Sequence, residues 1–161
     1  MRNFLPIALL VLVGVAVAQE PTRPAAQKSE AAKKAELPLL IVHKSESCGC
    51  CEVWVRHMEQ AGFKVEVHNE KNLDPIKRAM GVPANGESCH TAKIDRYFIE
   101  GHVPAEDVKR MLAERPNAMG LTVPGMPIGS PGMEQGNRRD PYDVLLVQRS
   151  GKTSVYAHHG D

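Results

Sequence analysis

Residues 39–62 read LLIVHKSESCGCCEVWVRHMEQAG and join two contrasting patterns. The run from Leu39 to Val42 is short, continuous and apolar, which is typical of a strand buried on both faces. Beyond the cysteines, Trp54, Met58 and Ala61 recur at helical spacing, and Gly62 is a suitable C-terminal cap. The segment therefore predicts a strand, a cysteine-bearing turn and a helix over residues 51–61.

The alternation of strand and helix patterns continues after Gly62. Phe63, Val65 and Val67 alternate with polar residues, which predicts a second strand with one buried face. Further along, the sequence predicts a short helix from Asp74 to Gly81, a hairpin over 91–101 and a helix over 104–115. Residues 117–143 are rich in Gly and Pro and predict a long loop, and residues 144–147 and 154–157 predict a final hairpin.

This element order is that of an α/β, thioredoxin-like domain, here extended by a long Gly/Pro/Met-rich loop and a C-terminal β-hairpin. The right-handed crossover rule makes the first two strands a parallel pair. The order also places Cys48, Cys50 and Cys51 between the first strand and the first helix, where the helix dipole favours thiolate over thiol.

The N-terminus has the features of a targeting segment. Arg2 precedes an apolar run from Phe4 to Ala18, and Ala16-Val17-Ala18 supplies the small residues of a cleavage site. The run is about 15 residues, short of the roughly 20 that span a bilayer. We therefore expect a signal peptide over 1–18, a disordered tether over 19–36, a folded domain over 37–161, periplasmic localisation and no stable membrane anchor after cleavage.

Length and charge narrow the function classes. The 161 residues, 42% of them hydrophobic, suit one domain. Removing residues 1–18 removes one base and no acid, so 19 basic residues face 19 acidic ones in the mature chain. This balance disfavours nucleic acid as a partner.

The cysteines carry the chemistry. Cys48 and Cys51 form a C-x-x-C pair with Cys50 inside it, and a third adjacent thiol would scramble an ordinary dithiol exchange. Cu(I) is soft and thiolates bridge copper ions, so clustered cysteines suit a copper-thiolate site, and a multinuclear one is open. A single structural zinc fits less well, because its ligands usually come from two separated knuckles. Cys89, just before the predicted hairpin, would complete a four-sulfur site.

Two disulfides are the alternative use of four cysteines, with three connectivities open. The short spacing within 48–51 offers little loop-closure stabilisation, which counts against this alternative.

At this point the sequence resembles the CopG-type periplasmic copper-resistance proteins over residues 39 to about 158. The resemblance rests on Cys48-Gly-Cys-Cys51 followed by Trp54, Gly81-Val82-Pro83, Ser88-Cys89-His90-Thr91, Ile99-Glu100-Gly101-His102-Val103-Pro104, Gly120-Leu121, and the run from Val123-Pro-Gly-Met-Pro to Ser130-Pro-Gly-Met133. It implies a thioredoxin-like fold, a copper cluster ligated by Cys48, Cys50, Cys51 and Cys89, and a role in copper tolerance.

Other soft or basic side chains are additional candidates. Met119, Met126 and Met133 offer thioethers that suit Cu(I), although methionines also serve as apolar pegs for a Gly/Pro loop. His90 adjoins Cys89 and is either a ligand or a hydrogen-bonding neighbour of one. His102 is expected to pack or hydrogen-bond beside Gly101.

Two functions follow. The leading hypothesis is a periplasmic protein that holds Cu(I) in a thiolate cluster, with Cu(I)/Cu(II) cycling, and hence a copper oxidoreductase activity, left open. The alternative is a thiol-disulfide oxidoreductase using Cys48 and Cys51, with Cys50 or Cys89 as the resolving thiol. Copper ions and periplasmic copper-handling or redox proteins are the expected partners.

Overall fold

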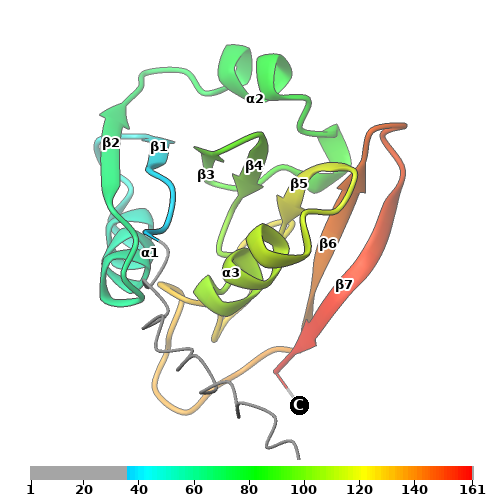
Figure 1. The fold of residues 1–161 in the computed structure, drawn as a ribbon. Coiled ribbons are helices and arrows are strands. Elements are labelled where there is room, and N and C mark those ends of the chain that lie inside the picture. Colours follow the sequence, from blue (N-terminus) through cyan, green and yellow to red (C-terminus); the bar gives the residue numbers. More distant parts are fainter. Residues whose placement is uncertain (1–35, 161) are drawn as a thin grey trace, which may run out of the picture. The chain divides into compact units, whose positions relative to one another are not determined.

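The computed structural model describes residues 36–160, which form a mixed α/β domain (Figure 1). Three helices and seven strands occur within these residues. In chain order they are β1 (Leu40–Lys44), α1 (Gly49–Gln60), β2 (Val65–Asn69), α2 (Asp74–Met80), a short 3-10 turn η1 (Ala84–Gly86), β3 (His90–Ile94), β4 (Tyr97–Glu100), α3 (Ala105–Glu114), β5 (Ala118–Thr122), β6 (Tyr142–Gln148) and β7 (Thr153–His159).

The strands form one sheet in the order β2-β1-β3-β4-β5-β6-β7. β1 and β2 are parallel, which confirms the prediction from the crossover rule. β3 pairs antiparallel with both β1 and β4, and β6 with β7, so both predicted hairpins are confirmed. The C-terminal end of β1 thus points into the turn that carries the cysteines.

Burial of the first two strands differs from the prediction. β1 alternates, with Leu40, Val42 and Lys44 buried and the residues between them half-buried, so it is covered fully on one face only. β2 is an edge strand on which only Val65 is partly buried. The prediction of a buried face on β2 is wrong for Val67, which is 39% exposed, because an edge strand has a neighbour on one side only.

β5 corrects the predicted loop over 117–143, whose first part is a strand. Gly120 interrupts the hydrophobic pattern of this segment, and the fold requires glycine there. A Cβ at Gly120 would lie 2.0 Å from the carbonyl oxygen of Phe98 on the paired strand. From Val123 to Pro141 the chain has turns and one isolated bridge, between Gln135 and Arg138.

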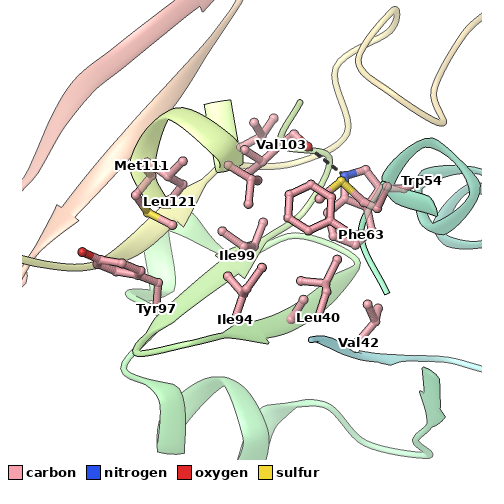
Figure 2. Close-up of a cluster of buried hydrophobic side chains, with 14 of the residues drawn as sticks. Leu40, Val42, Trp54, Phe63, Ile94, Tyr97, Ile99, Val103, Met111 and Leu121 are labelled. Atoms are coloured by element: carbon pink, nitrogen blue, oxygen red, sulfur yellow. Dashed lines mark hydrogen bonds between the residues drawn. The ribbon is translucent and has the colours of Figure 1, made fainter. Parts of the chain in front are cut away.

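The core packs α1 and α3 against the sheet (Figure 2). Trp54 of α1 is fully buried, and its indole Nε1 donates a hydrogen bond of 2.9 Å to the carbonyl oxygen of Val103. The main cluster includes Leu40, Val42, Met58, Phe63, Ile94, Ile99, Met111 and Leu121. By anchoring Trp54, the core holds the first turn of α1, and with it the cysteines, against the end of the sheet.

The predicted signal peptide (1–18) and nearly all of the predicted tether (19–36) lie outside the described residues. Among residues 36–160, none of the helices has the length and hydropathy that crossing a bilayer requires.

Candidate metal centre

Three of the four cysteines lie at the start of α1. Cys48 is the N-cap residue, with extended backbone, and makes no side-chain capping bond. Cys50 and Cys51 lie in the first turn. The free amides and the positive end of the helix dipole at this position stabilise negative charge on sulfur.

One disulfide is present among the described cysteines. Cys48 and Cys51 are bonded across a Cα–Cα separation of 5.3 Å, while Cys50 and Cys89 are thiols. The Sγ atoms of Cys50 and Cys48 are 3.5 Å apart. The arrangement with two disulfides is therefore not the one observed.

Cys89 reaches the other three cysteines from a segment 38 residues beyond Cys51. Its Sγ lies 3.5 Å from the Sγ of Cys51. All four sulfur atoms lie within 4.8 Å of one another, and we call them the cysteine cluster. The structure thus brings together the four sulfurs that the sequence singled out.

His102 lies closer to the cysteine cluster than the sequence analysis expected. Its Nδ1 is 2.8 Å from the carbonyl oxygen of Pro131, and its Nε2 is 3.0 Å from Cys89 Sγ. Burial lowers the pKa of His102, so the ring is neutral at pH 7. Because a carbonyl only accepts, Nδ1 carries the proton and Nε2 presents a lone pair to the sulfur. In the sequence, the only feature that pointed to a role for His102 was its place in the Gly101-His102-Val103-Pro104 motif after β4.

His90 is the second imidazole beside Cys89. It is fully buried, with Nδ1 3.3 Å from Cys89 Sγ and the ring centroid 4.3 Å from that of Trp54. Desolvation, aided by the neighbouring His102, holds its pKa well below the usual range. Its Nε2 is a buried polar atom with no hydrogen-bond partner. Cys89, His90 and His102 thus place one sulfur and two neutral imidazoles within 4.8 Å.

The thiol of Cys89 holds its proton firmly. Burial, and next the adjacent Cys50, raise its pKa to about 12. Metal binding at this sulfur must therefore displace a proton.

A buried ion pair holds the segment that carries Cys89. Lys77 of α2 contacts Glu100 of β4 and donates to the Ser88 carbonyl oxygen at 3.0 Å, and both charged side chains are buried. Glu100 in turn accepts the Ser88 amide at 2.6 Å and the Thr91 hydroxyl at 2.6 Å. Desolvation raises the pKa of Glu100, an effect that the bonds from Lys77 oppose. Both backbone groups of Ser88 are thereby fixed, one residue before Cys89.

A second, half-exposed pair lies on the α1 side of the cysteine cluster. Lys44, buried at the end of β1, contacts Glu52 of α1 at 2.5 Å and Asn69 of β2 at 3.2 Å. Glu52 is 48% exposed, so water reaches this pair.

The two Pro-Gly-Met turns of the long segment contact the two parts of the chain that carry the cysteines. Ser88 donates its hydroxyl to the Gly125 carbonyl oxygen, which ties the first turn to the segment of Cys89. Gly132 of the second turn, with φ +89°, lies so close to α1 that a Cβ there would be 2.6 Å from the Cys50 carbonyl oxygen. The second turn therefore covers the first turn of α1.

The three candidate methionines differ in their surroundings. Met119 packs beside Val82, Phe98 and Val147, with its methyl group towards Gly81, which favours a packing role. Met126 is 52% exposed, and Met133 is half-buried next to Gly132.

Comparisons with known proteins agree with this geometry. Residues 86–133 match the family model described as "Protein of unknown function, DUF411". Two solved structures, "Copper resistance protein copG- Form 2" and "Copper resistance protein copG- Form 1", are each 48% identical to the chain with a TM-score of 0.74. The matches cover 77% and 78% of this chain and 99% and 100% of those chains. A search of curated proteins finds no match.

The fold and the site define a class of protein: a mixed α/β domain with a cysteine cluster at the N-terminus of its first helix. At this identity and coverage, the chain belongs to the CopG copper resistance protein family.

Proposed function

We propose that the chain is a periplasmic copper-tolerance protein whose thioredoxin-like domain holds Cu(I) in a cysteine-thiolate cluster formed by Cys48, Cys50, Cys51 and Cys89. The observation that carries the proposal is the convergence of four sulfurs within 4.8 Å at a helix N-terminus. The name of the two solved relatives, copper resistance protein, supports copper as the metal. Localisation rests on the sequence pattern of residues 1–18.

The donor set fits Cu(I) better than a hard ion. Thiolate sulfur is a soft ligand, and the neutral rings of His90 and His102 add nitrogen donors that also suit copper. The cysteine cluster as described contains no carboxylate. Because sulfurs this close can bridge metal ions, we propose a site for more than one copper ion.

The observed disulfide defines the entry step. A dithiol reductant supplies the two electrons and two protons that convert the Cys48–Cys51 disulfide into two thiols, and is itself oxidised to a disulfide. The two cysteine thiols then release their protons to the solvent as Cu(I) binds. The reduced chain is therefore the copper-binding form, and the oxidised chain lacks two of the four ligands.

The thiol-disulfide oxidoreductase remains the second candidate, because the Cys48–Cys51 disulfide is the expected form of a C-x-x-C enzyme. Cys89 is poorly suited to resolve a mixed disulfide, however. Burial raises the pKa of this thiol to about 12, so the sulfur is in the thiol form at pH 7, whereas the thiolate is the form that attacks a disulfide. The raised pKa therefore counts against Cys89 as the resolving thiol and leaves Cys50 for that role.

The deciding experiment titrates the reduced mature chain with Cu(I) anaerobically and measures copper per chain by mass spectrometry beside the thiol count. We expect more than one tightly held copper per chain, and a lower stoichiometry for Cys50→Ser. His57→Asn, on the exposed side of α1, is the matched control and keeps full loading. Less than one bound copper, together with fast reduction of insulin, would favour the oxidoreductase instead.

Cycling between Cu(I) and Cu(II) is tested on the loaded chain. If the chain is a copper oxidoreductase, Cu(II) signals in electron paramagnetic resonance appear with a chemical oxidant and disappear with a reductant over repeated cycles, without copper loss. Irreversible loss of copper on the first oxidation indicates storage or transfer alone.

Each candidate methionine is tested by a single substitution compared with a control. If Met133 or Met126 supplies a thioether, its substitution by Leu weakens Cu(I) binding in a competition assay. Met119→Leu is the matched control, because Met119 packs in an apolar cluster.

A further inference from the structure

Two histidines lie face to face at the outer edge of the sheet. His43 of β1 and His68 of β2 are register partners in the parallel pair, and their ring centroids are 5.1 Å apart with an interplanar angle of 30°. Because side chains alternate along a strand, Glu66 and Glu70 lie on the same face of the chain as His68. We call these four residues the edge cluster.

Each imidazole of the edge cluster is held by its own carboxylate. His43 Nδ1 is 3.0 Å from Glu70, and His68 Nε2 is 2.7 Å from Glu66. These bonds use one nitrogen per ring and leave Nε2 of His43 and Nδ1 of His68 for another partner. A carboxylate that orients a histidine through its second nitrogen is the usual outer arrangement of histidine metal sites.

The spacing of the rings allows one ion to bind both. Nitrogens bound to the same ion at about 2 Å lie no more than about 4 Å apart. Rings with centroids 5.1 Å apart reach that separation by turning, and His68, 44% exposed, has room to turn. The two glutamates add negative charge that attracts a cation.

We propose that His43 and His68, supported by Glu70 and Glu66, form a second metal site that takes Cu(II). Nitrogen and oxygen donors without sulfur favour a borderline divalent ion over Cu(I), and Cu(II) stands highest in the affinity order of such ions. The site shares no residue with the cysteine cluster. The chain would thus bind the two oxidation states of copper with two different sets of donors.

The test adds substoichiometric Cu(II) to the ¹⁵N-labelled mature chain already loaded with Cu(I), which is diamagnetic. We expect amide signals of Lys44 and Asn69 to broaden first, and paramagnetic resonance to show two coordinated nitrogens. Ni(II), which thiols do not reduce, is the second probe and is used on the copper-free chain. Its result does not depend on Cu(I) loading.

Variants identify the ligands. His68→Asn, at an exposed position, should weaken Cu(II) binding at least about tenfold, and Glu66→Gln about tenfold through the orientation of the ring. His57→Asn is the matched control, because His57 is 40% exposed and pairs with Glu134 at 2.7 Å but belongs to no histidine pair in the described structure. Unchanged binding in His68→Asn, or an equal loss in His57→Asn, would overturn the proposal. So would broadening that starts elsewhere with both probes.

Discussion

Three of the clustered sulfurs come from the N-cap and first turn of α1, whereas the fourth comes from residue 89, on the segment that enters β3. The first three are positioned by helix geometry and are adjacent in sequence. Cys89 depends on a buried ion pair, two histidines and the Gly/Pro-rich segment. The cysteine cluster thus has a local part, which is the start of α1 with three cysteines, and a tertiary part, which is Cys89 with the contacts that hold it. We expect the tertiary part to be the more vulnerable to mutation, because its position depends on contacts between distant segments.

The largest effect is expected for the buried ion pair between Lys77 and Glu100, which holds the tertiary part of the cysteine cluster. Glu100→Gln leaves Lys77 buried without its counter-charge, so the free energy of unfolding should fall by about 3–5 kcal/mol. Glu52→Gln removes the half-exposed partner of Lys44 on the helix side and should cost at most about 1 kcal/mol. Urea unfolding measures both. Equal losses of unfolding free energy in the two variants would show that the local and tertiary parts of the cysteine cluster are held equally firmly.

The next prediction concerns the contact between the long segment and α1. Gly132→Ala combines a left-handed backbone conformation with a Cβ 2.6 Å from the Cys50 carbonyl oxygen, and should destabilise the chain by about 2–4 kcal/mol. Gly136→Ala is the matched control. Gly136 also has positive φ but open space around its Cβ, so only about 1 kcal/mol is expected. Thermal unfolding gives the difference, and similar values would mean that the second turn does not press on α1.

Acid should destabilise the fold around Cys89 through the two histidines that contact this cysteine, His90 and His102. The folded pKa values of His90 and His102 are lowered, so these rings bind protons more readily in the unfolded chain, whose histidines titrate near 6.5. Their neutral form thus contributes stability above about pH 6.5 that is lost as the pH falls below it towards the folded pKa values. The loss is at most about 1.4 kcal/mol per pH unit for each ring, and it reaches that slope only where the folded ring is still neutral.

Unfolding of the copper-free chain between pH 7 and pH 5 measures this slope. His90→Asn should make it shallower by one proton. An unchanged slope in that variant would contradict the burial argument for His90.

The smallest expected effect is the pH dependence of Cu(I) binding at Cys89. If Cys89 ligates Cu(I), the metal must displace its proton throughout the neutral range, because burial raises the pKa of this thiol to about 12. This step should raise the apparent Cu(I) affinity about tenfold per pH unit. Cys89→Ser should lower the pH dependence by one proton, as measured by competition with a chromophoric chelator. If the dependence is the same in both proteins, Cys89 is not a ligand.

Local pattern was sufficient for the elements whose signals are local. The helical spacing of Trp54 and Met58, the helix start at Asp74 and the hairpin pattern of residues 91–101 are each contained in a short stretch of sequence. The helices α1 and α2 and the β3–β4 hairpin form where they were predicted. β5 was missed because Gly120 breaks its pattern, and that glycine is required by the Phe98 carbonyl oxygen of another strand. The residues next to Gly120 in the sequence therefore do not show why glycine is needed at this position.

The site divides in the same way. The sequence by itself determined the cluster of Cys48, Cys50 and Cys51 at a helix start, because neighbouring residues at the first turn of a helix are close in space in any fold. Only the tertiary structure decided that Cys89 lies 3.5 Å from Cys51, and that the His102 ring lies 3.0 Å from Cys89. These contacts arise from sheet order and a buried ion pair, which pair residues that sequence spacing leaves unrelated.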